Sequence, residues 1–148
     1  MKQTQGFTVV ELMIVIVIAG VLLAAGIPGF ISMARQNAVT TTSNELLNSV
    51  LLARSEAVRQ EQDVTLTPSA TGWQVVDEDG DDIQNKTVDN RDITIVGANP
   101  ITYNPRGRTT NNVAETIAIQ YEGTNESYLC LSLTGRPYIK SAEEGTCP

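Results

Sequence analysis

The residue of this chain with the clearest chemical requirement is Glu11, a lone carboxylate in a long apolar run. The run covers residues 7–33, and after Glu11 the next charged residue is Arg35. A single acid inside a membrane span costs about 2.5–3.5 kcal/mol on insertion scales. Because buried charges are normally paired, we expect Glu11 to have a compensating partner.

Basic residues in two later turns form a second candidate site. Two of them flank Gly107, and the other two follow Gly135: Arg106, Arg108, Arg136 and Lys140. If the fold brings the two turns together, these side chains form a positive patch able to contact the phosphates of DNA. The alternative interpretation is that they are solvated turn charges.

Acidic residues form a third candidate, because five acids stand within residues 77–82 and offer the oxygen ligands that calcium prefers. The spacing does not fit an EF-hand loop, since Gly80 is its fourth residue and Val88 occupies the position of the bidentate Glu. We favour a solvated hairpin turn in which Asp79 and Gly80 take positive φ angles. No metal site is predicted.

The composition argues against an enzyme. The 148 residues include no His, which removes the commonest general base and the commonest transition-metal ligand. No nucleophile motif or phosphate-binding loop accompanies the acids. We therefore predict a non-enzymatic protein without a cofactor, and its net charge of −7 opposes nonspecific affinity for nucleic acid.

The two cysteines, Cys130 and Cys147, lie in the part of the chain that we expect to be exported, where an oxidising compartment allows a disulfide. On the chain-entropy model, closing a loop of this length stabilises the fold by about 3 kcal/mol. The alternatives are two free thiols or a metal pair, although two Cys without His make an incomplete zinc site.

The elements that must position these residues begin with a helix. Residues 7–33 exceed the roughly 20 apolar residues that a membrane-spanning helix needs. Lys2 is the single basic residue of the preceding leader, residues 1–6, and it favours a cytoplasmic N-terminus with the rest of the chain outside. Pro28 is expected to kink or locally melt this helix.

The helical pattern continues beyond the membrane as an amphipathic segment, residues 34–61. Its apolar stripe comprises Leu46, Val50, Ala53 and Ala57, widened by Leu47, Leu51 and Val58. Arg54 leaves this stripe, and spacing alone does not say what it binds. This outer half of the helix is expected to pack on the domain that follows.

From residue 62 to residue 148 the apolar period changes to 2, and turn residues recur at short intervals. The expected strands cover residues 63–67, 73–76, 93–96, 101–103, 116–121, 128–133 and 137–140. The predicted fold class is α+β, a long kinked N-terminal helix packed on an antiparallel β domain.

The start of the apolar run resembles the type IV prepilin family, whose signature here reads Gly6-Phe7-Thr8-Val9-Val10-Glu11. The resemblance implies cleavage by a prepilin peptidase between Gly6 and Phe7, with N-methylation of Phe7. It also implies that Glu11 pairs with the Phe7 amine of a neighbouring subunit and that the helix unwinds at Pro28 during assembly. The alternatives are an ordinary membrane anchor with an accidental Glu and, for Pro28, a passive kink.

The rest of the chain is similar to the GspH/FimT group of minor pilins and pseudopilins. The resemblance is carried by Ala53-Arg54-Ser55-Glu56-Ala57, Tyr103-Asn104-Pro105-Arg106-Gly107 and Leu133-Thr134-Gly135-Arg136-Pro137. Residues 77–99 are left unmatched.

The resemblance implies a minor type IV pilin, a structural subunit that helps to initiate or cap pilus assembly through helix–helix packing. It would reside in the inner membrane as a single-pass protein, with its C-terminal domain in the periplasm, before it enters the fibre. Its partners would be other minor and major pilins and the prepilin peptidase. The alternatives are a type II secretion pseudopilin and a minor pilin that binds DNA in natural transformation.

Overall fold

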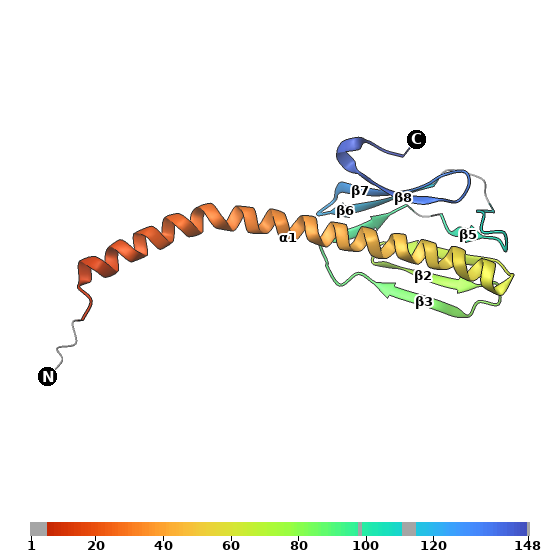
Figure 1. Cartoon of the computed structure of the whole chain (residues 1–148), viewed down its shortest axis with the longest axis horizontal. Helices are drawn as coiled ribbons and strands as arrows, with labels where there is room; N and C mark the ends of the chain where they lie inside the picture. Colours follow the sequence, from red (N-terminus) through yellow and green to blue (C-terminus); the bar gives the residue numbers. More distant parts are fainter. Residues whose placement is uncertain (1–5, 98, 111–114, 148) are drawn as a thin grey trace. The chain divides into compact units, whose positions relative to one another are not determined.

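The computed structural model describes residues 6–97, 99–110 and 115–147, and within them one long helix precedes eight β-strands (Figure 1). The chain divides into two compact units, residues 1–36 and residues 37–148. Helix α1, Val9–Gln60, contributes to both units.

In the first unit, α1 is an apolar helix with exposed side chains. An 18-residue window of this helix has a mean hydropathy of 2.7, and none of the window is buried. Phe30 is 74% exposed, and Phe7, just before the helix, is 82% exposed. Because each Å² of apolar surface left in water costs about 25 cal/mol, lipid or other apolar helices are needed to cover this segment.

Pro28 lies inside α1, and the helix is continuous on both sides of it. Of the two expected effects of Pro28, a kink or local melting, local melting is therefore wrong. A proline removes one backbone donor, and the flanking turns keep their own hydrogen bonds. Beside it, the Ser32 hydroxyl donates to the Gly29 carbonyl at 2.9 Å. The unwinding role suggested for Pro28 stays a prediction.

In the second unit, the outer half of α1 packs through the expected stripe. Leu46, Val50 and the two alanines of the stripe, Ala53 and Ala57, are all fully buried. Leu51 and Val58 are 43% and 51% exposed, so their assignment to the buried stripe is wrong. The domain covers a narrower face of the helix than the apolar residues occupy.

Two four-stranded antiparallel sheets complete this unit. The first has the order β3-β2-β1-β5, formed by Asp82–Thr87, Gly72–Asp77, Val64–Ser69 and Ile101–Tyr103. The second has the order β4-β6-β7-β8, formed by Ile93–Val96, Glu115–Tyr121, Thr124–Leu131 and Pro137–Ser141. A short 3₁₀ helix, η1 (Ala142–Glu144), follows β8.

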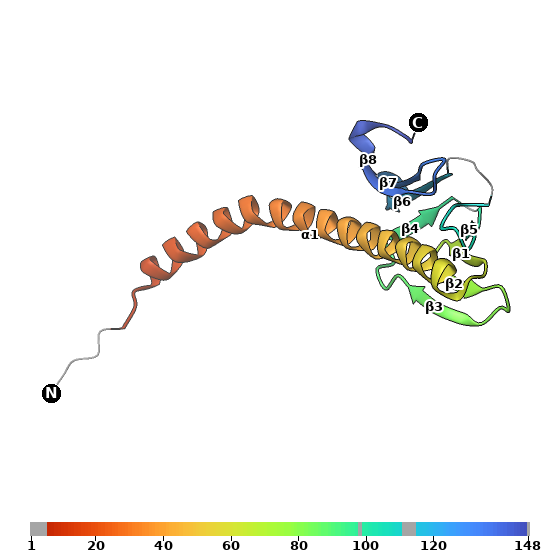
Figure 2. The same cartoon turned by 45° about the vertical axis from the view of Figure 1, so that its right-hand side comes forward.

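The core lies between α1 and both sheets. One cluster of buried apolar side chains joins Leu46 of α1 to Leu66 of β1, Ile95 of β4 and Leu129 of β7. Figure 2 shows β6, β7 and β8 of the second sheet above the helix and β3 of the first sheet below it. The α+β fold class is confirmed.

Each strand expected from the sequence has a counterpart in the structure, and β3 is the strand that the sequence analysis missed. Its residues, Asp-Ile-Gln-Asn-Lys-Thr, carry a single strongly apolar side chain. β3 forms because it pairs with β2, from Gly72 opposite Thr87 to Val76 opposite Asp82. As an edge strand it needs little apolar surface of its own.

Leu46→Ala is expected to lower the free energy of unfolding by about 3 kcal/mol, because it removes a fully buried side chain and leaves a cavity. The matched control is Leu51→Ala on the same helix, with an expected loss of about 0.5 kcal/mol since Leu51 is 43% exposed. The measurement is urea unfolding of the full chain in detergent, followed by fluorescence of Trp73, the single tryptophan, which is 2% exposed. Equal losses at the two positions would contradict the packing described above.

Candidate functional sites

The expected processing site lies just before α1 begins. Gly6, Phe7 and Thr8 belong to no helix or strand, and all three are exposed. A Cβ added to Gly6 would meet no atom within 4 Å in the described part of the chain. The Gly6–Phe7 bond is therefore exposed, and packing against the described residues does not explain a glycine at position 6.

Thr8 is the N-cap of α1. Its Oγ1 accepts a hydrogen bond from the Glu11 N–H at 3.2 Å, and its carbonyl accepts one from the Leu12 N–H at 3.2 Å. A Thr hydroxyl bonded to the N–H of a Glu three residues later is half of a capping box, and such a cap contributes about 1 kcal/mol. This role was not predicted from the sequence, although Thr-x-x-Glu before an apolar run signals it. The cap fixes where the helix starts, and so how far Glu11 lies from Phe7.

Glu11 lies exposed in the first turn of α1. The helix N-terminus favours a negative charge by about 0.5 kcal/mol, far less than the 2.5–3.5 kcal/mol cost of a carboxylate in a membrane. Within the described residues no cation is paired with its carboxylate. Most of the compensation that Glu11 needs therefore has to come from outside this set of residues.

The acidic residues 77–82 form the turn between β2 and β3, as the favoured interpretation predicts. Gly80 has φ 86° as expected, but Asp79 has no positive φ, so the prediction is wrong for Asp79. The loop is longer because the Asp77 carboxylate and carbonyl accept hydrogen bonds from the N–H groups of Asp81 (2.8 Å) and Gly80 (3.1 Å). No group of acids within the described residues is arranged to hold a metal ion.

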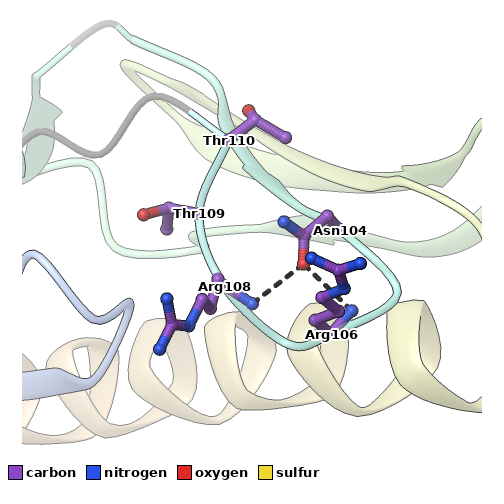
Figure 3. A pocket seen from close by; sticks show the side chains of 5 residues that line it. All are labelled: Asn104, Arg106, Arg108, Thr109 and Thr110. Carbon is purple, nitrogen blue, oxygen red and sulfur yellow. Dashed lines mark hydrogen bonds between the residues drawn. The ribbon is translucent and has the colours of Figure 1, made fainter.

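Arg106 and Arg108 lie on the loop that follows β5, and Asn104 organises this loop (Figure 3). The Asn104 Oδ1 accepts hydrogen bonds from the Arg106 N–H at 3.0 Å and the Arg108 N–H at 3.2 Å. The Gly107 N–H donates to the Asn104 carbonyl at 2.8 Å, and Gly107 has φ 69°. The loop backbone is thus held in place while both arginine side chains are exposed.

A pocket of about 450 Å³ opens on this loop, lined by Asn104, Arg106, Arg108, Thr109 and Thr110. Figure 3 shows that the side chains of Arg106 and Arg108 leave the loop in different directions. The Arg108 side chain extends toward the blue turn between β7 and β8. The two guanidinium groups therefore border the loop from two sides.

Tyr103 joins this loop to the turn between β7 and β8. Its side chain is fully buried, and its hydroxyl donates to the Gly135 carbonyl at 2.7 Å. Gly135 has φ 76°, and a Cβ there would lie 3.0 Å from the Tyr103 ring and 3.2 Å from the Thr109 nitrogen. Arg136, the next residue, therefore lies on a turn that packs against the loop of Arg106 and Arg108, as the patch prediction requires.

Lys140 does not belong with these arginines. It lies near the other end of β8, opposite Tyr128, and its ammonium donates to the Thr146 carbonyl at 3.2 Å. Lys140 comes four positions after Arg136, which in an extended strand corresponds to about 13 Å. The hypothesis of a positive patch therefore does not extend to Lys140, because the strand carries it away from the turn.

Arg54 also lies at this site, although its place there was not predicted from the sequence. It is half-buried on α1, and a Cβ on Gly107 would meet its Nε at 3.3 Å. Glu56 from the same motif behaves differently, because its carboxylate accepts hydrogen bonds from Arg59 and Gln60, which lower the pKa of Glu56. In the sequence, Arg54 could have been singled out by its place in the motif at residues 53–57. Its contact with Gly107, however, is seen only in the folded structure.

Burial raises the pKa of Tyr103 to about 12, although the nearby positive charge of Arg54 acts in the opposite direction. In the unfolded chain a tyrosine loses its proton near pH 10. The protonated Tyr103 side chain therefore contributes to the free energy of unfolding. This contribution is fully present below about pH 10 and is lost as the pH rises to about 12.

Tyr103→Phe is expected to lower the free energy of unfolding by about 1 kcal/mol at neutral pH, because the Gly135 carbonyl loses its donor. Between about pH 10 and 12 the difference between the parent and this variant is expected to shrink, since only the parent has a titrating group at this position. Urea unfolding at a series of pH values checks this. A difference that stays constant with pH would contradict the assigned cause.

Cys130 and Cys147 form a disulfide with a Cα–Cα distance of 5.6 Å. The bond holds the end of the chain against the second sheet, where Cys147 and Ala142 pack on a small cluster that contains Ala118, Tyr128 and Cys130. Replacing both cysteines by alanine is expected to lower the free energy of unfolding by about 3 kcal/mol. The parent protein under reducing conditions is the matched control and should lose a similar amount in urea unfolding. A loss near zero in both would contradict a stabilising role.

Comparisons with known proteins match both parts of the chain. Residues 42–135 match the family described as type II transport protein GspH, and residues 1–27 match the prokaryotic N-terminal methylation motif. No curated protein gives a significant match.

Among solved structures, the fold is similar to the type IV minor pilin FimU of Pseudomonas aeruginosa strain PAO1 in two crystal forms. One form has 19% identity and a TM-score of 0.66, covering 78% of this chain and 99% of FimU. The other has 20% identity and a TM-score of 0.59, covering 74% of this chain and 99% of FimU. At this identity the likeness is one of fold.

Proposed function

This chain belongs to the GspH family, and on that premise we propose that it is a minor type IV pilin that helps to initiate or cap pilus assembly. The observation that carries the proposal is the N-terminal half of α1. It exposes an apolar surface that follows the leader, residues 1–6, and carries one carboxylate, Glu11, which has no paired cation within the described residues. In this proposal the apolar surface of the helix is buried in lipid before assembly and against the helices of other subunits in the fibre.

The N-terminal residues have separate roles in this proposal. A prepilin peptidase cuts between Gly6 and Phe7, and the new terminus at Phe7 is N-methylated. Glu11 then pairs with the Phe7 amine of a neighbouring subunit, which supplies the compensation that the carboxylate needs. Before assembly the chain is anchored in the inner membrane with its β domain in the periplasm, and its partners are other minor and major pilins. Its role is structural and not enzymatic.

The family match also favours a second candidate, a pseudopilin of a type II secretion system, because the family is described as a type II transport protein. The same helix packing would then build a short periplasmic fibre. The two candidates differ in the fibre that is lost when the protein is absent.

The deciding experiment compares pili sheared from the parent, a deletion strain and a complemented strain. Loss of surface pili that complementation restores would support the minor pilin. Normal pili together with a loss of secreted proteins would contradict it and support the pseudopilin. A complementing copy with Glu11→Val should fail in either case, because assembly depends on this carboxylate.

A further inference from the structure

Arg54 is a half-buried cation without an acidic partner among the residues that the structure describes. Two other cations are paired with acids: Arg59 with Glu56 on the same helix, and Lys86 with Glu45 at 3.1 Å. Partial burial removes water from a guanidinium group, and an opposite charge normally offsets that cost. For Arg54, no carboxylate in residues 6–97, 99–110 or 115–147 does so.

The surroundings of Arg54 add positive charge. Its side chain lies against Gly107, the residue between Arg106 and Arg108, and the turn that carries Arg136 packs on the same loop through Tyr103. Like charges gathered at one end of a domain repel one another, and a bound anion relieves that repulsion.

The site is also held in a fixed shape. Gly107 is buried, and a Cβ there would meet Val58 Cγ2 at 3.2 Å as well as Arg54 Nε at 3.3 Å, so the loop sits tightly on α1. Asn104 fixes the backbone on either side of Gly107. The adjacent pocket of about 450 Å³ is lined in part by Thr109, which is 7% exposed and whose hydroxyl has no hydrogen-bond partner among the described residues.

We propose that Arg54, together with Arg106 and Arg108, binds carboxylate groups on an acidic segment of a neighbouring fibre subunit. This proposal rests on the proposed function as a fibre subunit. A carboxylate suits Arg54 because a guanidinium group donates two parallel hydrogen bonds to it. The protein has a net charge of −7, so any acidic ligand is repelled by the rest of its surface. Salt screens this repulsion beyond about 8–10 Å, so a short acidic segment bound at the arginines is little affected. DNA is longer and would bring many phosphates close to the acidic surface.

The test uses the full chain in detergent and a fluorescent peptide that copies residues 77–82 as a model acidic segment. The variants are Arg54→Gln and Arg54→Lys, and the matched control is Arg59→Gln, on the same helix. We expect both Arg54 variants to lower the affinity about tenfold, because lysine cannot reproduce the paired hydrogen bonds. Arg59→Gln should have little effect, and added salt should weaken binding to the parent.

Equal effects of Arg54→Gln and Arg59→Gln would overturn the proposal. So would a parent that binds a short DNA duplex but not the peptide, since the site would then serve phosphates. Trp73 fluorescence checks that each variant is folded. If Arg54→Gln does not fold, the double variant Arg106→Gln/Arg108→Gln takes its place with the same expected loss. Failure of peptide binding would leave leader processing and fibre entry unaffected, so it is distinguishable from a failure of the proposed function.

Discussion

Gly6→Val is expected to stop removal of the leader, so that the precursor accumulates in the membrane and no mature chain appears. Gly6 is exposed, and a side chain there would meet open space, so the folded domain should be unaffected. The loss of cleavage would therefore arise because a branched side chain next to the Gly6–Phe7 bond hinders binding of this site to the peptidase. Immunoblotting for the size of the chain, with intact-mass analysis of its N-terminus, measures the result.

Gly6→Ala is the matched control for this prediction, because it adds one methyl group at the same position and should leave measurable processing. Normal cleavage of the Gly6→Val chain would show that the bond between Gly6 and Phe7 is not the processing site. The fold of each variant can be checked through the fluorescence of Trp73, which is buried in β2 and far along the chain from the leader.

Glu11→Val is expected to keep the protein in the membrane while removing it from the sheared fibre, with a drop of at least about tenfold. Membrane insertion improves, because the change removes a cost of about 2.5–3.5 kcal/mol. Assembly weakens because a charge-assisted hydrogen bond to a neighbour, with a contribution of about 1.5–3 kcal/mol, is lost. The measurement is the ratio of fibre-bound to membrane-bound protein on immunoblots.

Two further variants separate charge from shape at this position. Glu11→Gln keeps the size of the side chain and removes its charge, so it should fail nearly as badly as Glu11→Val if the partner is an amine. Leu12→Val alters a neighbouring apolar residue and should enter the fibre normally. A Glu11→Val protein that enters the fibre as well as the parent would refute the pairing of Glu11 with a neighbouring terminus.

The local elements of this protein can be predicted from its sequence because each depends on residues close together in the chain. The apolar period identifies α1, and the stripe from Leu46 to Ala57 is buried as its spacing predicts. The strands with alternating apolar residues lie where the sequence places them. The motif at residues 6–11 and the resemblance to the GspH/FimT group need no tertiary structure either, since both are read from consecutive residues.

Tertiary structure decided the features that depend on segments distant in the chain. β3 is a strand because β2 pairs with it, and Leu51 is exposed because the sheets cover one narrow face of the helix. Tyr103 reaches across 32 residues to Gly135, while the extended strand β8 carries Lys140 away from the same turn. Arg54 meets Gly107 only after α1 has packed on the sheets. Periodicity fixes which face of an element is apolar, but the packing of elements against one another decides which polar groups meet.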